Sequence, residues 1–513
     1  MRGLKRAISI AAALLCLSAL CYSQEYEVQE ESLGPLHERL WAAAWSRDGL
    51  HFAYVYTRDG KWFVVLDGRE GPEYEDIGTP FLLYTLGIRG CLAQPDFGSL
   101  EGSLTFSPGG SRIAYAANRA GKWFVVLDGQ EGQECHDIVL HSLVFSPDGT
   151  RLAYLAWRDE EVFAVVDAQK GPEYGLIAPL VFSPDGRRVA YTALKGDKMV
   201  AVVDDEEGPE YEGVDEPIFS PDGGRVAYAA EKGGKRLVVV DGQEGREYRL
   251  VYPPVFSPDG RRVAYAAQKS NKWSVVVDGE EGPEYDWIEG LTFSPDGNRV
   301  AYAAVRGSPR PGIGGKWFVV VDSEERPECD KIDHLMFSPG GGRLAYEARK
   351  GNKWVVVVGG EEGPEYDKVY RLVFSPDGSR EAYHAWRGQK EVVALDGQDG
   401  PEYDGIMEGT PIFSGDGTRL AYAARKGNKW VVVVDGQEQA EYDEVDRVVF
   451  SPDGSRVGYG ALRGSKWFVV VDGQEGPQYD SRVRGGPFFH DSGVVEYLAE
   501  RDDILYRVKH VPK

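Results

Sequence analysis

The sequence predicts an all-β protein that repeats one small four-stranded unit along nearly its whole length. Three observations predict this fold. The phrase Phe-Ser-Pro-Asp-Gly, or a variant of it, recurs at almost regular spacing. Each copy is followed by further short runs rich in β-branched and aromatic residues, which turn-forming residues separate. Glycine and proline, at 64 and 29 residues, are frequent but follow no collagen period, as in a chain of many tight turns.

The repeated unit contains four expected strands. Strand a holds Phe-Ser, and the Pro-Asp-Gly that follows favours a tight turn, because proline presets φ and glycine accepts positive φ. Strand b is a Val-Ala-Tyr-Ala run, strand c is a valine-rich run, and strand d contains Glu-Tyr-Asp-x-Ile. Many such units of about 37 residues in series predict a β-propeller. The twelve anchors begin at Trp45, Phe106, Phe145, Phe182, Phe219, Phe256, Phe293, Phe337, Phe374, Phe413, Phe450 and Phe489.

The two ends of the repeat region, which we assign to residues 24–513, complement each other. The last copy ends after strand c, at residues 504–510, whereas residues 24–28 resemble an orphan strand d ahead of the first strand a. We therefore expect the N-terminal strand to complete the last blade and close the ring, which removes an exposed sheet edge. We favour one continuous ring of twelve blades over two six-bladed rings, because no linker interrupts the repeats near Asp278.

Residues 1–23 have the pattern of a cleaved secretory signal peptide. Basic residues precede a short apolar run, and the small residue Ser23 ends the segment. A lipoprotein anchored through Cys21 is the rival interpretation, but Leu20 is not the small residue that such a site requires. We expect a periplasmic or extracellular protein, with no integral membrane segment after removal of the signal.

The number and distribution of charged residues indicate which classes of partner the protein can bind. With 82 acidic and 58 basic residues, the chain carries a formal charge of −24, which makes general nucleic-acid binding unfavourable. In an antiparallel blade, the a–b and c–d turns share one face and the b–c and d–a loops share the other. The c–d turns are acidic, whereas b–c loops such as residues 349–353 and 425–429 are basic. We therefore expect a basic face that docks a protein partner or an anionic envelope polymer.

Two insertions interrupt the regular spacing. Residues 79–101 are expected to extend the first d–a loop, and residues 306–315 to extend a b–c loop. Both would then lie on the basic face, where long loops on a rigid scaffold are common functional positions.

The copies differ most just before strand a, at the expected inner rim of the basic face. A site on a symmetric ring must break the symmetry, so these variable positions are the binding candidates. From them we select His141, His334, Arg371 and Arg447 as predicted binding residues. The other variable positions are Asp215, Glu216, Thr410 and Asp446. We assign no catalytic residue, cofactor or metal site.

Three cysteines follow the signal segment. Cys135 and Cys329 occupy a repeat position that is tyrosine in other copies, and Cys91 lies in the first insertion. We expect the first two to be half-buried substitutes, with a Cys91–Cys135 bridge as an alternative. No spacing suggests a zinc site.

The Phe-Ser-Pro-Asp-Gly phrase, followed by Arg-x-Ala-Tyr, resembles the WD-repeat-like (PD40-like) propeller repeats of TolB-type periplasmic proteins. The resemblance covers nearly all of residues 24–513 and implies the fold. The chain departs from TolB because it has no leading α/β domain and about twice as many blades. Since propellers host unrelated activities, the resemblance leaves function open.

We predict a non-catalytic scaffold that binds a protein or an anionic envelope partner through the basic, insert-bearing face. One alternative is a propeller enzyme, a hydrolase or lyase acting at the central channel. However, no G-x-S-x-G motif is present, and the eight histidines are scattered. Another alternative is a structural envelope component whose faces stack head to tail.

Overall fold

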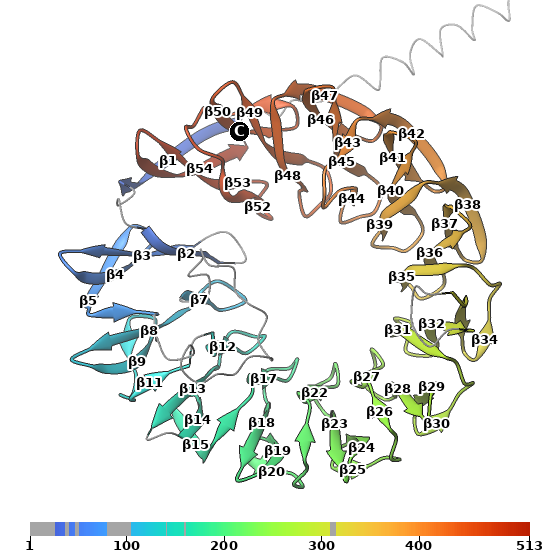
Figure 1. Ribbon diagram of the computed structural model, residues 1–513. Helices are drawn as coiled ribbons and strands as arrows, with labels where there is room; N and C mark the ends of the chain where they lie inside the picture. Colours follow the sequence, from blue (N-terminus) through green and yellow to red (C-terminus); the bar gives the residue numbers. More distant parts are fainter. Residues whose placement is uncertain are drawn as a thin grey trace, which may run out of the picture.

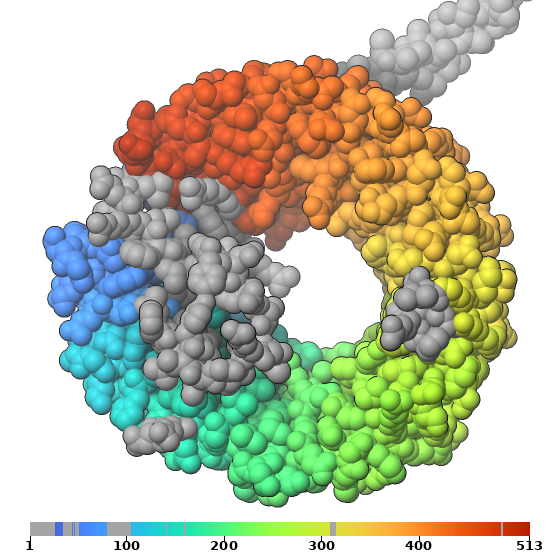
Figure 2. All heavy atoms as spheres, viewed as in Figure 1, coloured from blue at the N-terminus to red at the C-terminus, as the bar shows by residue number. Residues whose placement is uncertain are grey.

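The computed structural model describes residues 26–35, 40–46, 51–78, 104–139, 141–158, 161–307 and 314–512. In these ranges every regular element is a β-strand, and the strands form twelve antiparallel sheets. The sheets surround one open channel as the blades of a single ring (Figures 1 and 2). The fold is a twelve-bladed β-propeller, so the expectation of one continuous ring is confirmed. The expected signal peptide lies outside the described residues.

Each blade has the strand order a-b-c-d from the channel outward, and blades are numbered here from 1 to 12 in chain order. Strand a is undivided in six blades and divided into two short pieces in the other six. The undivided strands are β2 (Leu40–Trp45), β31 (Trp287–Phe293), β35 (Lys331–Phe337), β39 (Lys368–Phe374), β48 (Glu444–Phe450) and β52 (Arg484–Phe489). The divided ones are β6 (Asp76–Ile77) with β7 (Leu104–Phe106), β11 (Asp137–Ile138) with β12 (Val144–Phe145), β16 (Leu176–Ile177) with β17 (Val181–Phe182), β21 (Gly213–Val214) with β22 (Ile218–Phe219), β26 (Leu250–Val251) with β27 (Val255–Phe256), and β43 (Gly405–Ile406) with β44 (Ile412–Phe413).

Strands b, c and d complete the sheets. The b strands are β3 (Phe52–Arg58), β8 (Ile113–Arg119), β13 (Leu152–Arg158), β18 (Val189–Lys195), β23 (Val226–Lys232), β28 (Val263–Lys269), β32 (Val300–Arg306), β36 (Leu344–Lys350), β40 (Glu381–Arg387), β45 (Leu420–Lys426), β49 (Val457–Arg463) and β53 (Val495–Arg501). The c strands are β4 (Lys61–Leu66), β9 (Lys122–Leu127), β14 (Glu161–Val166), β19 (Lys198–Val203), β24 (Lys235–Val240), β29 (Lys272–Val277), β33 (Lys316–Val321), β37 (Lys353–Val358), β41 (Lys390–Leu395), β46 (Lys429–Val434), β50 (Lys466–Val471) and β54 (Ile504–Pro512). The d strands are β5 (Arg69–Tyr74), β10 (Gln130–Glu131), β15 (Gln169–Tyr174), β20 (Glu206–Glu207), β25 (Gln243–Glu244), β30 (Glu280–Glu281), β34 (Glu324–Glu325), β38 (Glu361–Tyr366), β42 (Gln398–Tyr403), β47 (Gln437–Tyr442), β51 (Gln474–Glu475) and β1 (Tyr26–Pro35).

The run expected to form strand d is shared between two blades. In blade 1, strand d ends at Tyr74, which pairs with Trp62, whereas Asp76–Ile77 already pairs with strand b of blade 2. The chain therefore changes blades directly after the tyrosine. As a consequence, residues 79–101 interrupt strand a of blade 2 and do not extend a d–a loop. Residues 306–315 connect β32 to β33. Residues 79–103 and 308–313 lie outside the described ranges.

The anchor phrase folds as a hydrogen-bonded turn that also reaches the next blade. In blade 6, Ser257 Oγ donates to Asp259 Oδ1 at 2.6 Å and accepts from the Arg262 N–H at 2.9 Å. Gly260 has a φ of +72°, which favours glycine. Arg262 pairs with Asp278 at 2.9 Å and donates to Asn298 O of blade 7 at 2.9 Å. The turn therefore fixes both the hairpin and the spacing between blades.

A second repeated contact joins the outer parts of neighbouring blades. Tyr248, which is bridged to strand c of blade 5, donates to Glu281 of blade 6 at 2.9 Å and meets Tyr265 of blade 6 edge-on at 6.3 Å. Lys269 pairs with the same glutamate at 2.6 Å. Buried valine, alanine and tyrosine side chains fill the space between successive sheets. The core is thus a series of interfaces between blades.

The N-terminal strand closes the ring, as expected. β1 pairs antiparallel with β54 from Tyr26↔Pro512 to Pro35↔Ile504. Glu30 accepts from Tyr479 of blade 11 at 2.7 Å and pairs with Arg501 at 2.7 Å. Glu30 therefore makes the contact that Glu281 makes elsewhere, although it comes from the opposite end of the chain. This shared contact explains why β1 fits the empty edge of blade 12.

The two described cysteines are buried free thiols, Cys135 and Cys329. The backbone of each cysteine pairs with that of a tryptophan of strand c, as the backbone of the equivalent tyrosine does in other blades. Burial raises the pKa of each thiol to about 11. Cys135 is thus unbridged here, and Cys91 lies outside the described residues.

Candidate functional site: the channel wall

The channel wall is formed by strand a of each blade, which is the innermost strand of the ring (Figure 1). Strand a of blades 7, 8, 9 and 11 carries a bulge, where the pairing with strand b shifts by one residue. Such bulges re-aim the side chains around them. The conformation of strand a, and with it the channel wall, therefore differs from one blade to another.

The bulge holds one residue in the left-handed region. In blade 7 this residue is Gly290, with a φ of +66°. The same position is His334 in blade 8, Arg371 in blade 9 and Arg447 in blade 11, with φ values of 49°, 47° and 41°. A non-glycine residue in this conformation costs about 1–2 kcal/mol. Three blades thus carry a side chain where glycine would fit without strain.

Three of the four predicted binding residues therefore occupy one structural position. They lie in the middle of strand a. From the sequence we expected them in a rim loop before that strand. The reason is that strand a begins earlier than the anchor phrase indicates, directly after the tyrosine of strand d. His141, the fourth, is exposed between β11 and β12 and also has a positive φ, of 57°.

Arg371 and Arg447 are exposed and, among the described residues, form no ion pair. The Arg447 guanidinium lies 5.8 Å from the ring centre of Phe488 in blade 12. Most other arginines of the described chain pair with a carboxylate or donate to a backbone carbonyl. These two side chains are therefore exposed charged donors on the innermost strand of their blades.

His334 stands beside a buried carboxylate. Its Nδ1 lies 3.0 Å from Oε1 of Glu347, whose side chain is only 2% exposed, while the imidazole is 59% exposed. Burial raises the pKa of Glu347. Glu347 belongs to strand b, at a position where alanine is the most frequent residue among the copies. The imidazole is therefore an exposed group that contacts a buried carboxylate.

The other variable positions have structural partners or remain exposed. Asp215 pairs with Arg236, Asp446 lies 3.3 Å from Arg482, and Thr410 Oγ1 donates to Met407 O at 2.7 Å. Glu216 is exposed. Only the bulge positions therefore combine exposure, charge and a strained backbone.

The b–c loops do not form the free basic face that we expected from the sequence. In blade 8, Lys353 pairs with Asp367 at 2.6 Å, and Asp367 also accepts from the Gly388 N–H of blade 9 at 2.7 Å. This arrangement recurs with Lys272–Asp286, Lys390–Asp404, Lys429–Asp443 and Lys466–Asp480. In these blades the aspartate after the strand-d tyrosine lies between neighbouring hairpins and neutralises a loop lysine.

Sequence reasoning missed polar residues in strand b. Glu347 and His384 each replace an alanine of the repeat. The His384 Nε2 lies 2.6 Å from Glu391 Oε2, and the pKa of His384 is lowered by burial. Comparison of the copies at this one position would have identified both residues.

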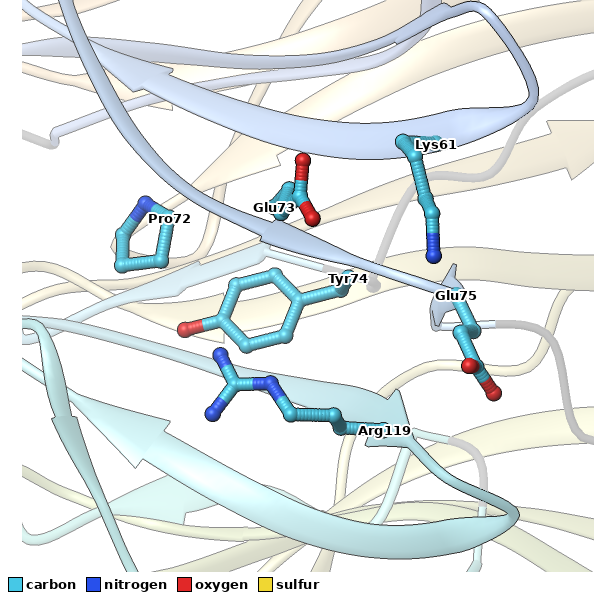
Figure 3. Close-up of a pocket in the computed structure, with 6 residues that line it drawn as sticks. All are labelled: Lys61, Pro72, Glu73, Tyr74, Glu75 and Arg119. Carbon is cyan, nitrogen blue, oxygen red and sulfur yellow. The ribbon is translucent and has the colours of Figure 1, made fainter.

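A shallow pocket on the outer part of blades 1 and 2 belongs to the repeat (Figure 3). It is lined by Lys61, Pro72, Glu73, Tyr74, Glu75 and Arg119. Lys61 and Glu75 occupy the positions of the Lys–Asp pairs described above, and the Arg119 guanidinium lies 5.1 Å from the Tyr74 ring centre. Because equivalent residues recur in other blades, we do not assign a site here.

Within the described ranges, no group of three or more His, Cys, Asp or Glu side chains is arranged to hold a metal ion. Over the same ranges, no helix has the length and apolar character needed to cross a membrane.

Solved structures resemble this chain only at low values of identity and TM-score. No known protein family and no curated protein matches the chain. A eukaryotic initiation factor structure is 12% identical over 64% of this chain and 96% of that chain, with a TM-score of 0.34. TolB from Acinetobacter baumannii is 14% identical over 48% of this chain and 77% of that one, with a TM-score of 0.23. The β-propeller domain of the Trilobed protease from Pyrococcus furiosus is 16% identical over 52% and 96%, with a TM-score of 0.28. At these values the likeness carries no argument about this chain.

Proposed function

We propose that this protein is a non-catalytic binding scaffold that holds an anionic partner in its central channel. The observation that carries this proposal is the position of Arg371 and Arg447 on the channel wall, exposed and without an ion pair among the described residues. His334, at the same bulge position, adds a third polar donor. Backbone strain that a protein retains at exposed side chains is a pointer to function.

The partner is an acidic protein segment or an anionic envelope polymer, met in the periplasm or outside the cell after export by the N-terminal segment. Arginine suits both, because its planar guanidinium binds carboxylates and phosphates in a bidentate manner. The formal charge of −24 repels polyanions at long range. Binding therefore depends on contacts inside the channel, and a salt concentration near 0.15 M limits the repulsion to about 8 Å.

The test uses the mature protein, with poly-L-glutamate and polygalacturonate as probes in isothermal titration. We expect one probe to bind, and the double variant Arg371→Glu/Arg447→Glu to weaken that binding by about tenfold or more, since a hydrogen bond to a charged group contributes about 1.5–3 kcal/mol. The matched control is Arg69→Glu/Arg326→Glu, which makes the same charge change at exposed positions on the outer edge of the ring.

The two probes separate the classes of partner, because only one of them is a peptide. Equal weakening by both double variants would contradict the proposal, since it would mean that only overall charge matters. Unchanged binding in the Arg371→Glu/Arg447→Glu variant would show that the binding site lies elsewhere on the protein.

A further inference from the structure

Two tyrosines occupy equivalent positions on the channel side of different blades. Tyr252 and Tyr370 each lie four residues before the anchor phenylalanine, in blades 6 and 9. The Tyr370 ring stacks on His384 at 5.2 Å. The ammonium group of Lys368 lies 4.1 Å from the same ring centre, well within the range of a cation–π contact. At this position, then, the protein binds an ammonium group of its own.

Like Tyr370, Tyr252 stacks on another aromatic ring, but no lysine ammonium group lies over it among the described residues. It lies on Trp273 with ring centres 4.8 Å apart and an angle of 14°. Trp287 of blade 7 meets it edge-on at 6.2 Å. The residue that matches Lys368 is Leu250, which is apolar and 45% exposed. Tyr252 itself remains 39% exposed.

A carboxylate stands beside these rings. Glu289 of blade 7 accepts a hydrogen bond from Trp287 Nε1 at 3.2 Å. Burial raises the pKa of Tyr252, and the negative charge of Glu289 raises it further. Pro253 and Pro254 follow Tyr252, and their fixed φ holds the ring in place. Aromatic rings with an adjacent carboxylate are the side chains that recognise organic cations.

We propose that Tyr252, Trp287 and Glu289 form a binding site for an alkylammonium group at the junction of blades 6 and 7, with Trp273, which is only 3% exposed, packed beneath the Tyr252 ring. The ligand replaces the lysine ammonium that blade 9 supplies from within. It is either the head of a small organic amine or a lysine side chain of another protein, which share this chemistry. The excess of negative charge on the protein favours the approach of cations. This site lies on other blades than Arg371 and Arg447 and does not depend on their role.

The experiment measures binding of tetramethylammonium to the mature protein by ligand-observed NMR at constant ionic strength. We expect saturable binding in the millimolar range and weaker binding of tert-butanol, a neutral molecule of similar shape. N-acetyl-lysine methylamide is the second probe. Tighter binding of this amide assigns the site to protein lysines, whereas tighter binding of tetramethylammonium assigns it to quaternary amines.

The decisive variant is Leu250→Lys, which supplies the internal ammonium found in blade 9. We expect it to weaken tetramethylammonium binding by about tenfold, the size of a desolvated cation–π contact. The matched control is Leu176→Lys, which adds the same charge at the same strand position of blade 4, where Leu176 is 38% exposed and Ala178 replaces the tyrosine. Glu289→Gln weakens binding by a few-fold without altering the rings.

Three results would overturn the proposal. One is equal binding of tert-butanol and tetramethylammonium, which would indicate an apolar patch. Another is the same effect from Leu250→Lys and Leu176→Lys, which would indicate general charge repulsion. The third is the absence of saturable binding up to about 0.1 M of either cationic probe, with a folded state verified by hydrogen exchange.

Discussion

Arginine occupies two positions in the repeat, and its surroundings there are opposite. In the a–b turn, arginines such as Arg262 and Arg456 pair with a carboxylate and donate to the backbone of the next blade or of the closing blade. On the channel wall, Arg371 and Arg447 are exposed at a strained bulge. The turn arginine is present in nearly every copy, and the bulge arginine in two. The difference teaches that the repeated arginines hold the ring together, whereas the two unrepeated arginines are left exposed on the innermost strand.

The largest effect is expected at the ring closure, from Arg456→Ala. Arg456 is 8% exposed, pairs with Asp472 at 2.8 Å, and lies 4.4 Å from the ring centre of Tyr26 in β1. Removing one partner of a fully buried ion pair costs about 3–5 kcal/mol, and the 38% exposure of the Asp472 side chain places the expected loss below that range. We expect faster hydrogen exchange in β53, β54 and β1, with blades 4–7 little changed. A loss below about 1 kcal/mol would show that turn and wall arginines are energetically alike.

A pH effect is expected at the same closure, from His510. Burial lowers the pKa of His510 to about 4, helped by nearby Arg456. Its Nε2 lies 3.0 Å from the Tyr497 hydroxyl. Below about pH 6.5 the unfolded chain binds a proton that the folded chain does not, so stability falls as pH falls toward 4.

From pH 7 to pH 5 this histidine removes about 2 kcal/mol from the stability of blade 12. The variant His510→Gln keeps a polar group at that place but has no titratable group. We expect hydrogen exchange in β54 of the variant to lack this part of the pH dependence. Equal pH dependence in the variant and the parent protein would assign the effect to other groups.

A smaller effect is expected for a turn arginine in the middle of the ring, from Arg262→Ala. Its side chain is 35% exposed and that of Asp278 is 45% exposed, so water screens the pair. We expect a loss of about 1 kcal/mol, measured by hydrogen exchange at the interface of blades 6 and 7. The variant Arg262→Lys keeps the charge but not the planar fork, and recovers only part of the loss.

Much of the fold followed from the sequence because each element repeats the same local chemistry. The Ser-Pro-Asp-Gly turn, the strand-b tyrosine and the complementary chain ends each predicted a feature that the structure contains. The bounds of strand d did not follow, because the blade change after the tyrosine depends on pairing between blades.

The candidate site was predicted in part. Comparison of the copies selected His334, Arg371 and Arg447, yet it could not show that they share a bulge, which is set by the register between strands a and b. The sequence did not show that loop lysines of the expected basic face are paired, because lysines and aspartates that are 14 residues apart in the chain meet across several hairpins. Such pairing depends on side-chain geometry, which charge counting ignores.

The smallest effect on stability, and the sharpest contrast, is expected from the double variant Arg371→Gly/Arg447→Gly. Gly290 already occupies this bulge position in blade 7, so the variant retains the bulge and relieves its strain. The greater freedom of glycine in the unfolded chain offsets this gain. We expect a stability change within about 0.5 kcal/mol, as for surface positions in general. Anionic ligand binding should nevertheless be lost. Unfolding of the variant would show that these arginines are structural residues of the repeat. Binding equal to that of the parent protein would show that they do not contact the ligand.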